Sequence, residues 1–144
     1  MAPVVIYQSH LVLEDFDGYE MFRLVEDFSV QVDDLLLTAQ AGMLTDGASI
    51  PRFFWRFIGS PLMGKYRRAV IIHDAGYGRS LLVQQVGHPE PVHPYPCKRW
   101  HDGMLKRLSL HDGVSRWRAG MMHVALKVGG GKAWRSGGVD ILGK

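Results

Sequence analysis

Each of three histidines in the sequence is followed directly by an aspartate, a pairing that can serve acid–base catalysis or metal binding. The pairs are His73-Asp74, His101-Asp102 and His111-Asp112. Adjacent side chains on a helix point about 100° apart, so one member of a pair can face a substrate while the other faces a metal or a partner. The third pair lies directly before Gly113 and the last predicted helix, which indicates a turn or a helix cap there rather than a site.

His73-Asp74 is the strongest of the three candidates because it follows the most apolar stretch of the second half, residues 69–72. Burying two ionisable groups there is costly unless both are paired. Tyr77 lies one helical turn beyond His73, and Asp102 lies on the next long helix. A histidine oriented by a carboxylate, with a tyrosine hydroxyl completing the hydrogen bonds, is the geometry of a general base. We predict His73, Asp102 and Tyr77 as catalytic residues; the alternative is a core histidine satisfied by its neighbours.

The length and composition bound the kind of protein that carries these residues. The chain has 144 residues, of which 47% are hydrophobic and 22% charged, as expected for one domain with its own core. One cysteine, Cys97, excludes a disulfide scaffold and a cysteine-based zinc cage. No apolar run is long enough for a transmembrane helix, and the first residues do not resemble a signal peptide. We therefore expect a protein of the cytoplasm or of a virion.

The net charge of +3 divides unevenly between the two halves of the chain. Residues 1–50 carry one base and nine acids, whereas residues 51–144 carry sixteen bases and five acids. The basic half also holds Trp55, Trp100 and Trp117, and basic surfaces with aromatic residues bind nucleic acid or anionic lipid headgroups. Because these tryptophans fall on the apolar stripes of predicted helices, we expect a solvated basic face and no nucleic-acid partner. The two halves are expected to pack together and compensate their charges.

The first 45 residues are predicted to be mainly β. Strands are expected at residues 4–7, 21–32 and 35–39, and the turn Asp33-Asp34 makes the last two an antiparallel pair. Residues 46–64 are predicted to form a loop and a short helix over residues 52–58, which Pro51 begins.

Residues 65–128 are predicted to be helical, with helices at 65–77, 97–109 and 114–128. The last helix is expected to face the core with Trp117, Met121, Val124, Ala125 and Val128. A long connection with four prolines spans residues 79–96, and residues 129–144 are expected to be a flexible tail. The prediction is a single α+β domain, a small N-terminal antiparallel β unit followed by three to four packed helices.

Four segments of this sequence resemble a family of phage and prophage proteins, domain-of-unknown-function family 1353. The segment 41–52 carries the string Thr45-Asp46-Gly47-Ala48-Ser49-Ile50-Pro51, which matches the block TDGASIP of the family. Residues 66–77 match its helix with His-Asp, and Asp102 with residues 104–105 and residues 117–122 match its last two helices. The resemblance covers about residues 20–134. It implies a phage-encoded protein with phage structural proteins as partners.

A more remote likeness concerns mechanism. The order His-Asp-x-x-Tyr on one helix, followed by an aspartate on an antiparallel helix, is similar to secreted phospholipase A2 enzymes. Carried over, His73 would be the base, Asp74 a calcium ligand, Asp102 the orienting carboxylate and Tyr77 its support. The glycine-rich calcium loop and all the disulfides of those enzymes are missing here, and the loop at Asp46 could stand in with carboxylate and carbonyl oxygens.

Two alternatives to this metal site stay open. Asp46 and the residues after it can form an ordinary Asp-Gly turn with Ser49 as a helix cap. Zinc bound by His73, Asp74 and His101 is the other, since open zinc sites use two histidines and one carboxylate. The prediction is thus a divalent metal, calcium or alternatively zinc, with Asp74 and Asp46 as ligands.

Two function classes follow. The first is a small hydrolase-like domain with a His-Asp site that acts on a cell-envelope component during entry or lysis. The second is a non-enzymatic virion tail or baseplate accessory protein, in which the same residues lock two helices together.

Overall fold

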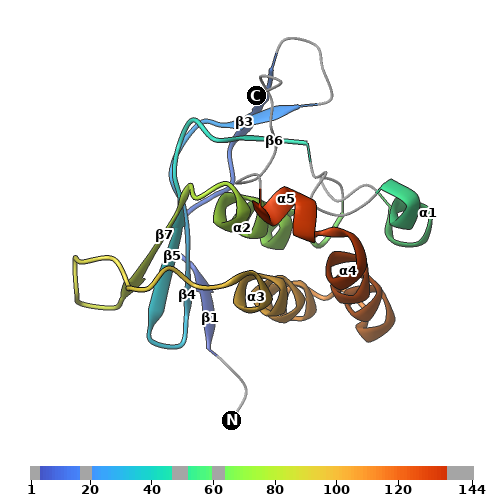
Figure 1. The fold of residues 1–144 in the computed structure, drawn as a ribbon. Coiled ribbons are helices and arrows are strands. Elements are labelled where there is room, and N and C mark those ends of the chain that lie inside the picture. Colours follow the sequence, from blue (N-terminus) through green and yellow to red (C-terminus); the bar gives the residue numbers. More distant parts are fainter. Residues whose placement is uncertain (1–3, 17–20, 47–51, 60–63, 136–144) are drawn as a thin grey trace.

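The computed structural model describes residues 4–16, 21–46, 52–59 and 64–135 and has a sheet on one side of a helical layer (Figure 1). The main sheet is antiparallel and has the order β1-β4-β5-β7. Its strands are β1 (Val5–Tyr7), β4 (Phe28–Val32), β5 (Leu35–Ala39) and β7 (Leu81–Gln85). A second sheet has the order β2-β3-β6, with β2 (Leu13–Asp15), β3 (Phe22–Leu24) and β6 (Leu44–Thr45). The predicted α+β class is confirmed.

The hairpin β4–β5 forms one wall of the core. Its pairing aligns Val30 with Leu37 and Val32 with Leu35, across the predicted turn at Asp33, whose φ is 54°. Alternate residues of β4 are buried, as period-2 patterning requires for a strand with one face on the core.

Helix α2 (Arg67–Tyr77) is the central element, buried without interruption from Ala69 to Tyr77. It packs on β5 and β7 and against α3 (Lys98–His111), and α4 (Arg116–Gly129) covers α3 on the side away from the sheet (Figure 1). Three short helices complete the layer: η1 (Arg52–Phe54), α1 (Trp55–Ile58) and α5 (Gly131–Arg135). No helix in the described part of the chain is long and apolar enough to cross a membrane.

Three segment predictions were wrong. The single strand expected at 21–32 is two strands, β3 and β4, which belong to different sheets. The connection expected at 79–96 contains β7, which adds an edge strand to the main sheet. The tail expected to be flexible contains α5, while residues 136–144 lie outside the described residues.

The predicted core stripe of the last helix was also wrong. Trp117 is 58% exposed, Val124 50% and Val128 75%. Of the predicted residues, Ala125 is buried and Met121 packs against the core; the other buried residues of α4 are Ala119, Met122 and Leu126. Their spacing is equally helical, so the periodicity alone could not say which face turns inward.

A buried carboxylate joins the β and helical parts. The Asp112 side chain, just after α3, is 2% exposed and accepts hydrogen bonds from the Tyr7 hydroxyl of β1 at 2.9 Å and the Arg68 guanidinium of α2 at 2.9 Å. The Arg68 guanidinium carbon also lies 3.6 Å from the centre of the Tyr7 ring. Asp112 and Arg68 both belong to the basic half and Tyr7 is uncharged, so these bonds join the two parts without compensating their charges; the exposed ion pair of Arg107 with Asp33 does cross between the halves.

Replacing Asp112 with asparagine should therefore lower the free energy of unfolding by about 1.5–3 kcal/mol, the range for a hydrogen-bonded charged group. Asp33→Asn is the control, because its ion pair with Arg107 is exposed on both sides and should be worth less than about 1 kcal/mol. Urea unfolding at pH 7 measures both. Equal effects of the two substitutions would contradict this ranking.

Candidate acid–base site

His73, Tyr77 and Asp102 meet between α2 and α3. His73 Nε2 lies 2.8 Å from Asp102 Oδ1, and the Tyr77 hydroxyl donates to the same oxygen at 2.5 Å. The other carboxylate oxygen, Oδ2, accepts from Lys98 Nζ at 2.7 Å. Lys98 also donates to the backbone carbonyl of Leu126 near the end of α4 at 2.9 Å, which ties the cluster to a third helix.

Helical spacing positions these side chains. His73 and Tyr77 are four residues apart on α2, and Lys98 and Asp102 are four apart on α3, so each pair lies on one face of its helix. The two helices approach closely because Gly76 has no side chain: a Cβ there would lie 2.3 Å from His101 Nδ1. Gly76 thus accommodates the imidazole that precedes Asp102.

Asp74 lies on the other side of the His73 ring. Its Oδ1 is 3.5 Å from His73 Nδ1, and its Oδ2 accepts a hydrogen bond from the Thr45 hydroxyl at the end of β6. The imidazole therefore has a carboxylate at each nitrogen. The side chain of His73 is 0% exposed, and those of Asp74 and Asp102 are 3% exposed.

Electrostatics fix the charge of Asp102. Burial alone would raise the pKa of this carboxyl, but hydrogen bonds from His73, Lys98 and Tyr77 outweigh it and lower the pKa to about 2. The Tyr77 hydroxyl stays neutral, because burial and its hydrogen bond to the anion both raise its pKa. Burial lowers the pKa of His73, but hydrogen bonds to Asp102 and Asp74 reverse that effect and raise it above 6.5.

His101, the other histidine of this region, sits in aromatic surroundings. Its ring centre is 5.3 Å from that of Tyr95, 5.5 Å from that of Trp134 and 5.0 Å from that of Trp100. Its Nε2 is buried and has no hydrogen-bond partner in the described ranges. Burial, with the nearby charge of His73 as the next cause, lowers the pKa of His101 to about 4.

The depressed pKa of His101 makes stability depend on pH. The folded protein keeps this ring neutral, whereas the unfolded chain takes up a proton below about pH 6.5. The free energy of unfolding should therefore fall as the pH drops from 6.5 towards 4, by at most about 1.4 kcal/mol per pH unit for one proton. Urea unfolding at pH 7 and pH 5 measures this slope. His101→Asn should flatten it, and an unchanged slope in that variant would contradict the assignment.

The structure brings together four of the five predicted site residues: His73, Asp74, Tyr77 and Asp102. The fifth, Asp46, directly follows Thr45, which bonds Asp74; residues 47–51 of the predicted loop lie outside the described residues. Among the described side chains, no group of three or more His, Cys, Asp or Glu is placed to hold a metal ion. The catalytic and metal-binding roles stay predictions.

Two residues of the cluster were missed by sequence reasoning. Lys98 carries a readable signal, since a base four residues from an acid on a predicted helix favours an ion pair. Thr45 opens the TDGASIP string, but only the fold shows that β6 places its hydroxyl on Asp74.

Comparison with known proteins now gives the family. Residues 22–126 match the model of the family described as "Protein of unknown function (DUF1353)". The chain belongs to this family. The expected family is thereby confirmed, and the match spans the site from β3 to α4. The likeness to phospholipase A2 stays a prediction.

One curated relative is similar to part of this DUF1353 chain. It is the "Uncharacterized protein y4jT" of Sinorhizobium fredii (strain NBRC 101917 / NGR234), 43% identical over 61 residues. The aligned part covers 42% of this chain and 18% of that protein, so the similarity spans about a fifth of the relative. No solved structure matches the chain.

Proposed function

We propose that this domain is a small hydrolase in which His73, oriented by Asp102, is the acid–base residue. The observation that carries the proposal is that Asp102 Oδ1 forms hydrogen bonds with both His73 Nε2 and the Tyr77 hydroxyl. A carboxylate that is held ionised by three donors fixes the rotation and the tautomer of the imidazole it contacts. Proton transfer is then assigned to Nδ1, which requires water to replace Asp74 Oδ1 as the partner of this nitrogen.

The proposed reaction is hydrolysis of an ester or amide bond. Neutral His73 takes a proton from water at Nδ1, the resulting hydroxide attacks the carbonyl carbon, and the imidazolium returns the proton to the leaving group. Because the pKa of His73 is raised, its neutral form increases above pH 6.5, and the rate should rise through that range. The proposed substrate is a cell-envelope component, as the phage and prophage character of the family resemblance implies.

A second candidate function rests on the burial of the same ring. With its side chain 0% exposed and a carboxylate at each nitrogen, His73 could serve only to lock α2 to α3. The protein would then be a non-enzymatic part of a virion, such as a tail or baseplate accessory protein.

Turnover assays separate the two candidates. Purified protein is incubated with p-nitrophenyl esters, phosphatidylglycerol vesicles and peptidoglycan, each with calcium, zinc or a chelator. We expect turnover of one substrate class and a loss of about 10²–10⁴-fold in His73→Asn, the range for a general base. His88→Asn is the matched control, since His88 is exposed and lies outside the cluster. Turnover that persists in His73→Asn would contradict the proposal.

Chemical modification of histidines, which needs no substrate, also separates the two candidate functions. Diethylpyrocarbonate modifies the neutral, solvent-reachable imidazoles of a folded protein. A hydrolase must let water reach His73 Nδ1, so His73 should react while the chain is folded, more slowly than His88. Modification of His88 without any at His73 would favour the locking role.

A further inference from the structure

We propose that a pocket at the start of α2 and α4 binds the phosphate group of a phosphate ester. The pocket has a volume of about 460 Å³ and is lined by residues 64–66, residues 113–115 and Arg118. None of these residues belongs to the His73 cluster, so this proposal does not depend on the hydrolase proposal.

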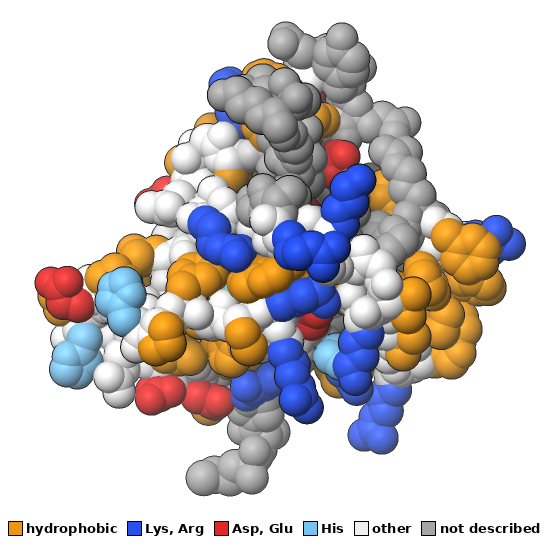
Figure 2. Space-filling model, in the orientation of Figure 1, with side chains coloured by type: hydrophobic (Ala, Val, Ile, Leu, Met, Phe, Trp, Pro, Cys, Tyr) orange, Lys and Arg blue, Asp and Glu red, His pale blue; other side chains and the backbone are white. Residues whose placement is uncertain are grey.

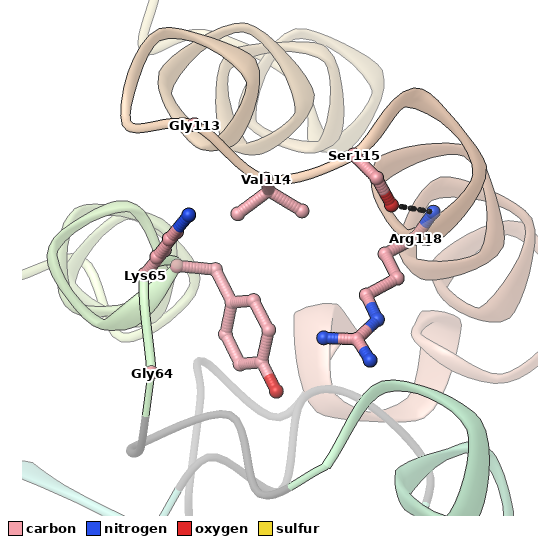
Figure 3. Close-up of a pocket in the computed structure, with 7 residues that line it drawn as sticks. Gly64, Lys65, Gly113, Val114, Ser115 and Arg118 are labelled. Carbon is pink, nitrogen blue, oxygen red and sulfur yellow. Dashed lines mark hydrogen bonds between the residues drawn. The ribbon is translucent and has the colours of Figure 1, made fainter.

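Two cationic side chains, Lys65 and Arg118, line this pocket. Figure 3 shows Arg118 reaching into it from α4, with Lys65 at its rim. Tyr66 also lines the pocket. The Lys65 ammonium lies against the turn between α3 and α4, since a Cβ on Gly113 would be 3.8 Å from Nζ. The charge of Arg118 also reaches the Tyr66 phenol, where it lowers a pKa that burial raises.

The pocket has positive charge and no negative charge among its described lining residues. Neither Lys65 nor Arg118 forms an ion pair with a carboxylate within the described ranges, although both are exposed. Two like charges beside one cavity repel each other, and an anion bound between them removes that repulsion. An arginine fork and a lysine ammonium together suit a phosphate dianion better than a single carboxylate.

Ser115 adds a polar group to the pocket wall. Its Oγ accepts a hydrogen bond from the backbone N–H of Arg118 at 3.3 Å and so caps α4. In the described part of the chain its own hydroxyl hydrogen has no acceptor, so it can donate to a phosphate oxygen. Because Ser115 caps α4, the phosphate would be bound by the side chains of the pocket rather than by free backbone N–H groups at the helix end.

The surroundings indicate an ester with an apolar part rather than inorganic phosphate alone. A volume near 460 Å³ is typical of pockets for organic ligands. Among the lining residues, Val114 and the Tyr66 ring supply apolar surface. Outside the pocket, Trp117 of α4 is 58% exposed and Phe53 is 59% exposed on η1, which packs against α4. Figure 2 shows hydrophobic side chains gathered over α1 and α4, with Lys and Arg side chains nearby. The phosphate could thus belong to a small aryl or alkyl ester or to a lipid headgroup.

Binding experiments test this site and distinguish the two sources. Phenyl phosphate is titrated into the full chain by calorimetry, with benzoate as the carboxylate comparison. Vesicles of phosphatidylcholine with and without phosphatidylglycerol are tested for cosedimentation and for competition with phenyl phosphate. The test variant is Lys65→Ala/Arg118→Ala. The control is Arg99→Ala/Lys106→Ala, which removes the same charge from exposed positions of α3 outside the pocket.

We expect phenyl phosphate to bind more tightly than benzoate and to lose at least about tenfold in affinity in Lys65→Ala/Arg118→Ala. The control variant should change the affinity by less than about threefold, as expected for exposed charges. Competition by phosphatidylglycerol vesicles would assign the phosphate to a lipid, and its absence to a small ester. The proposal is overturned if neither probe binds, if benzoate binds as tightly, or if both double variants weaken binding equally.

Discussion

Replacing Asp102 with asparagine should lower the free energy of unfolding by about 3–5 kcal/mol, the range for removing one partner of a buried ion pair. The Asp102 carboxylate forms hydrogen bonds with His73 Nε2, the Tyr77 hydroxyl and Lys98 Nζ, and the side chain is 3% exposed. An amide has no charge to offset the His73 imidazolium, and its NH2 group would face one of these donors. The proposed hydrolase activity should be lost with it.

Urea unfolding of the wild type and of Asp102→Asn at pH 7 measures this effect. Tyr77→Phe is the graded control, because it removes one donor of three and should cost about 0.5–3 kcal/mol. The dependence of stability on acid pH gives a second test of the role of Asp102. The folded pKa of Asp102 is lowered to about 2, so its contribution to stability is present above pH 4 and is lost as the pH falls from 4 to 2. A variant as stable as the wild type would show that the cluster does not hold α2 and α3 together.

Replacing Gly76 with alanine should destabilise the protein by about 1–3 kcal/mol or more, although alanine is the better helix former. The added Cβ would lie 2.3 Å from His101 Nδ1 and 3.0 Å from its Cγ, distances too short for contact. The ring cannot move away freely because Tyr95 and Trp134 pack against it. Helices α2 and α3 would have to separate, which also strains the His73–Asp102 bond.

Two matched glycines make this prediction sharp. Gly103 on α3 and Gly120 on α4 have nothing within 4 Å of a Cβ, so their alanine variants should gain up to about 1 kcal/mol from helix propensity. Thermal or urea unfolding of the three variants gives the order. If Gly76→Ala is as stable as Gly120→Ala, the close packing of α2 on α3 is contradicted.

The acid–base cluster was the most predictable part of the molecule. A spacing of four residues on one helix places His73 and Tyr77 together whatever the rest of the fold does, and two adjacent long helices in a small domain must pack. The partnership with Asp102 followed from those two facts. Thr45 could not be placed, because the fold brings a short strand of the second sheet to Asp74.

The errors in the fold have physical causes. The strand expected at 21–32 divides because Val25, Glu26 and Asp27 are exposed and form the crossing between two sheets. Strand β7 was missed because the prolines that follow it indicated a loop. Leu81 and Val83 are buried and alternate with less buried residues, as in a half-buried strand. The face of α4 was mistaken because large apolar residues were expected inward, whereas Trp117 and Val128 are exposed.

The most direct test of the account is a ¹⁵N NMR titration of the His73 ring in the folded protein. The structure holds Nε2 on Asp102, so the neutral ring should carry its proton on Nε2 and its midpoint should lie above 6.5. In Asp102→Asn the midpoint should fall, because the anion that favours the charged ring is gone. A neutral ring protonated on Nδ1, or a midpoint below 6.5 in the wild type, would contradict the orientation of His73 on which the proposed function rests.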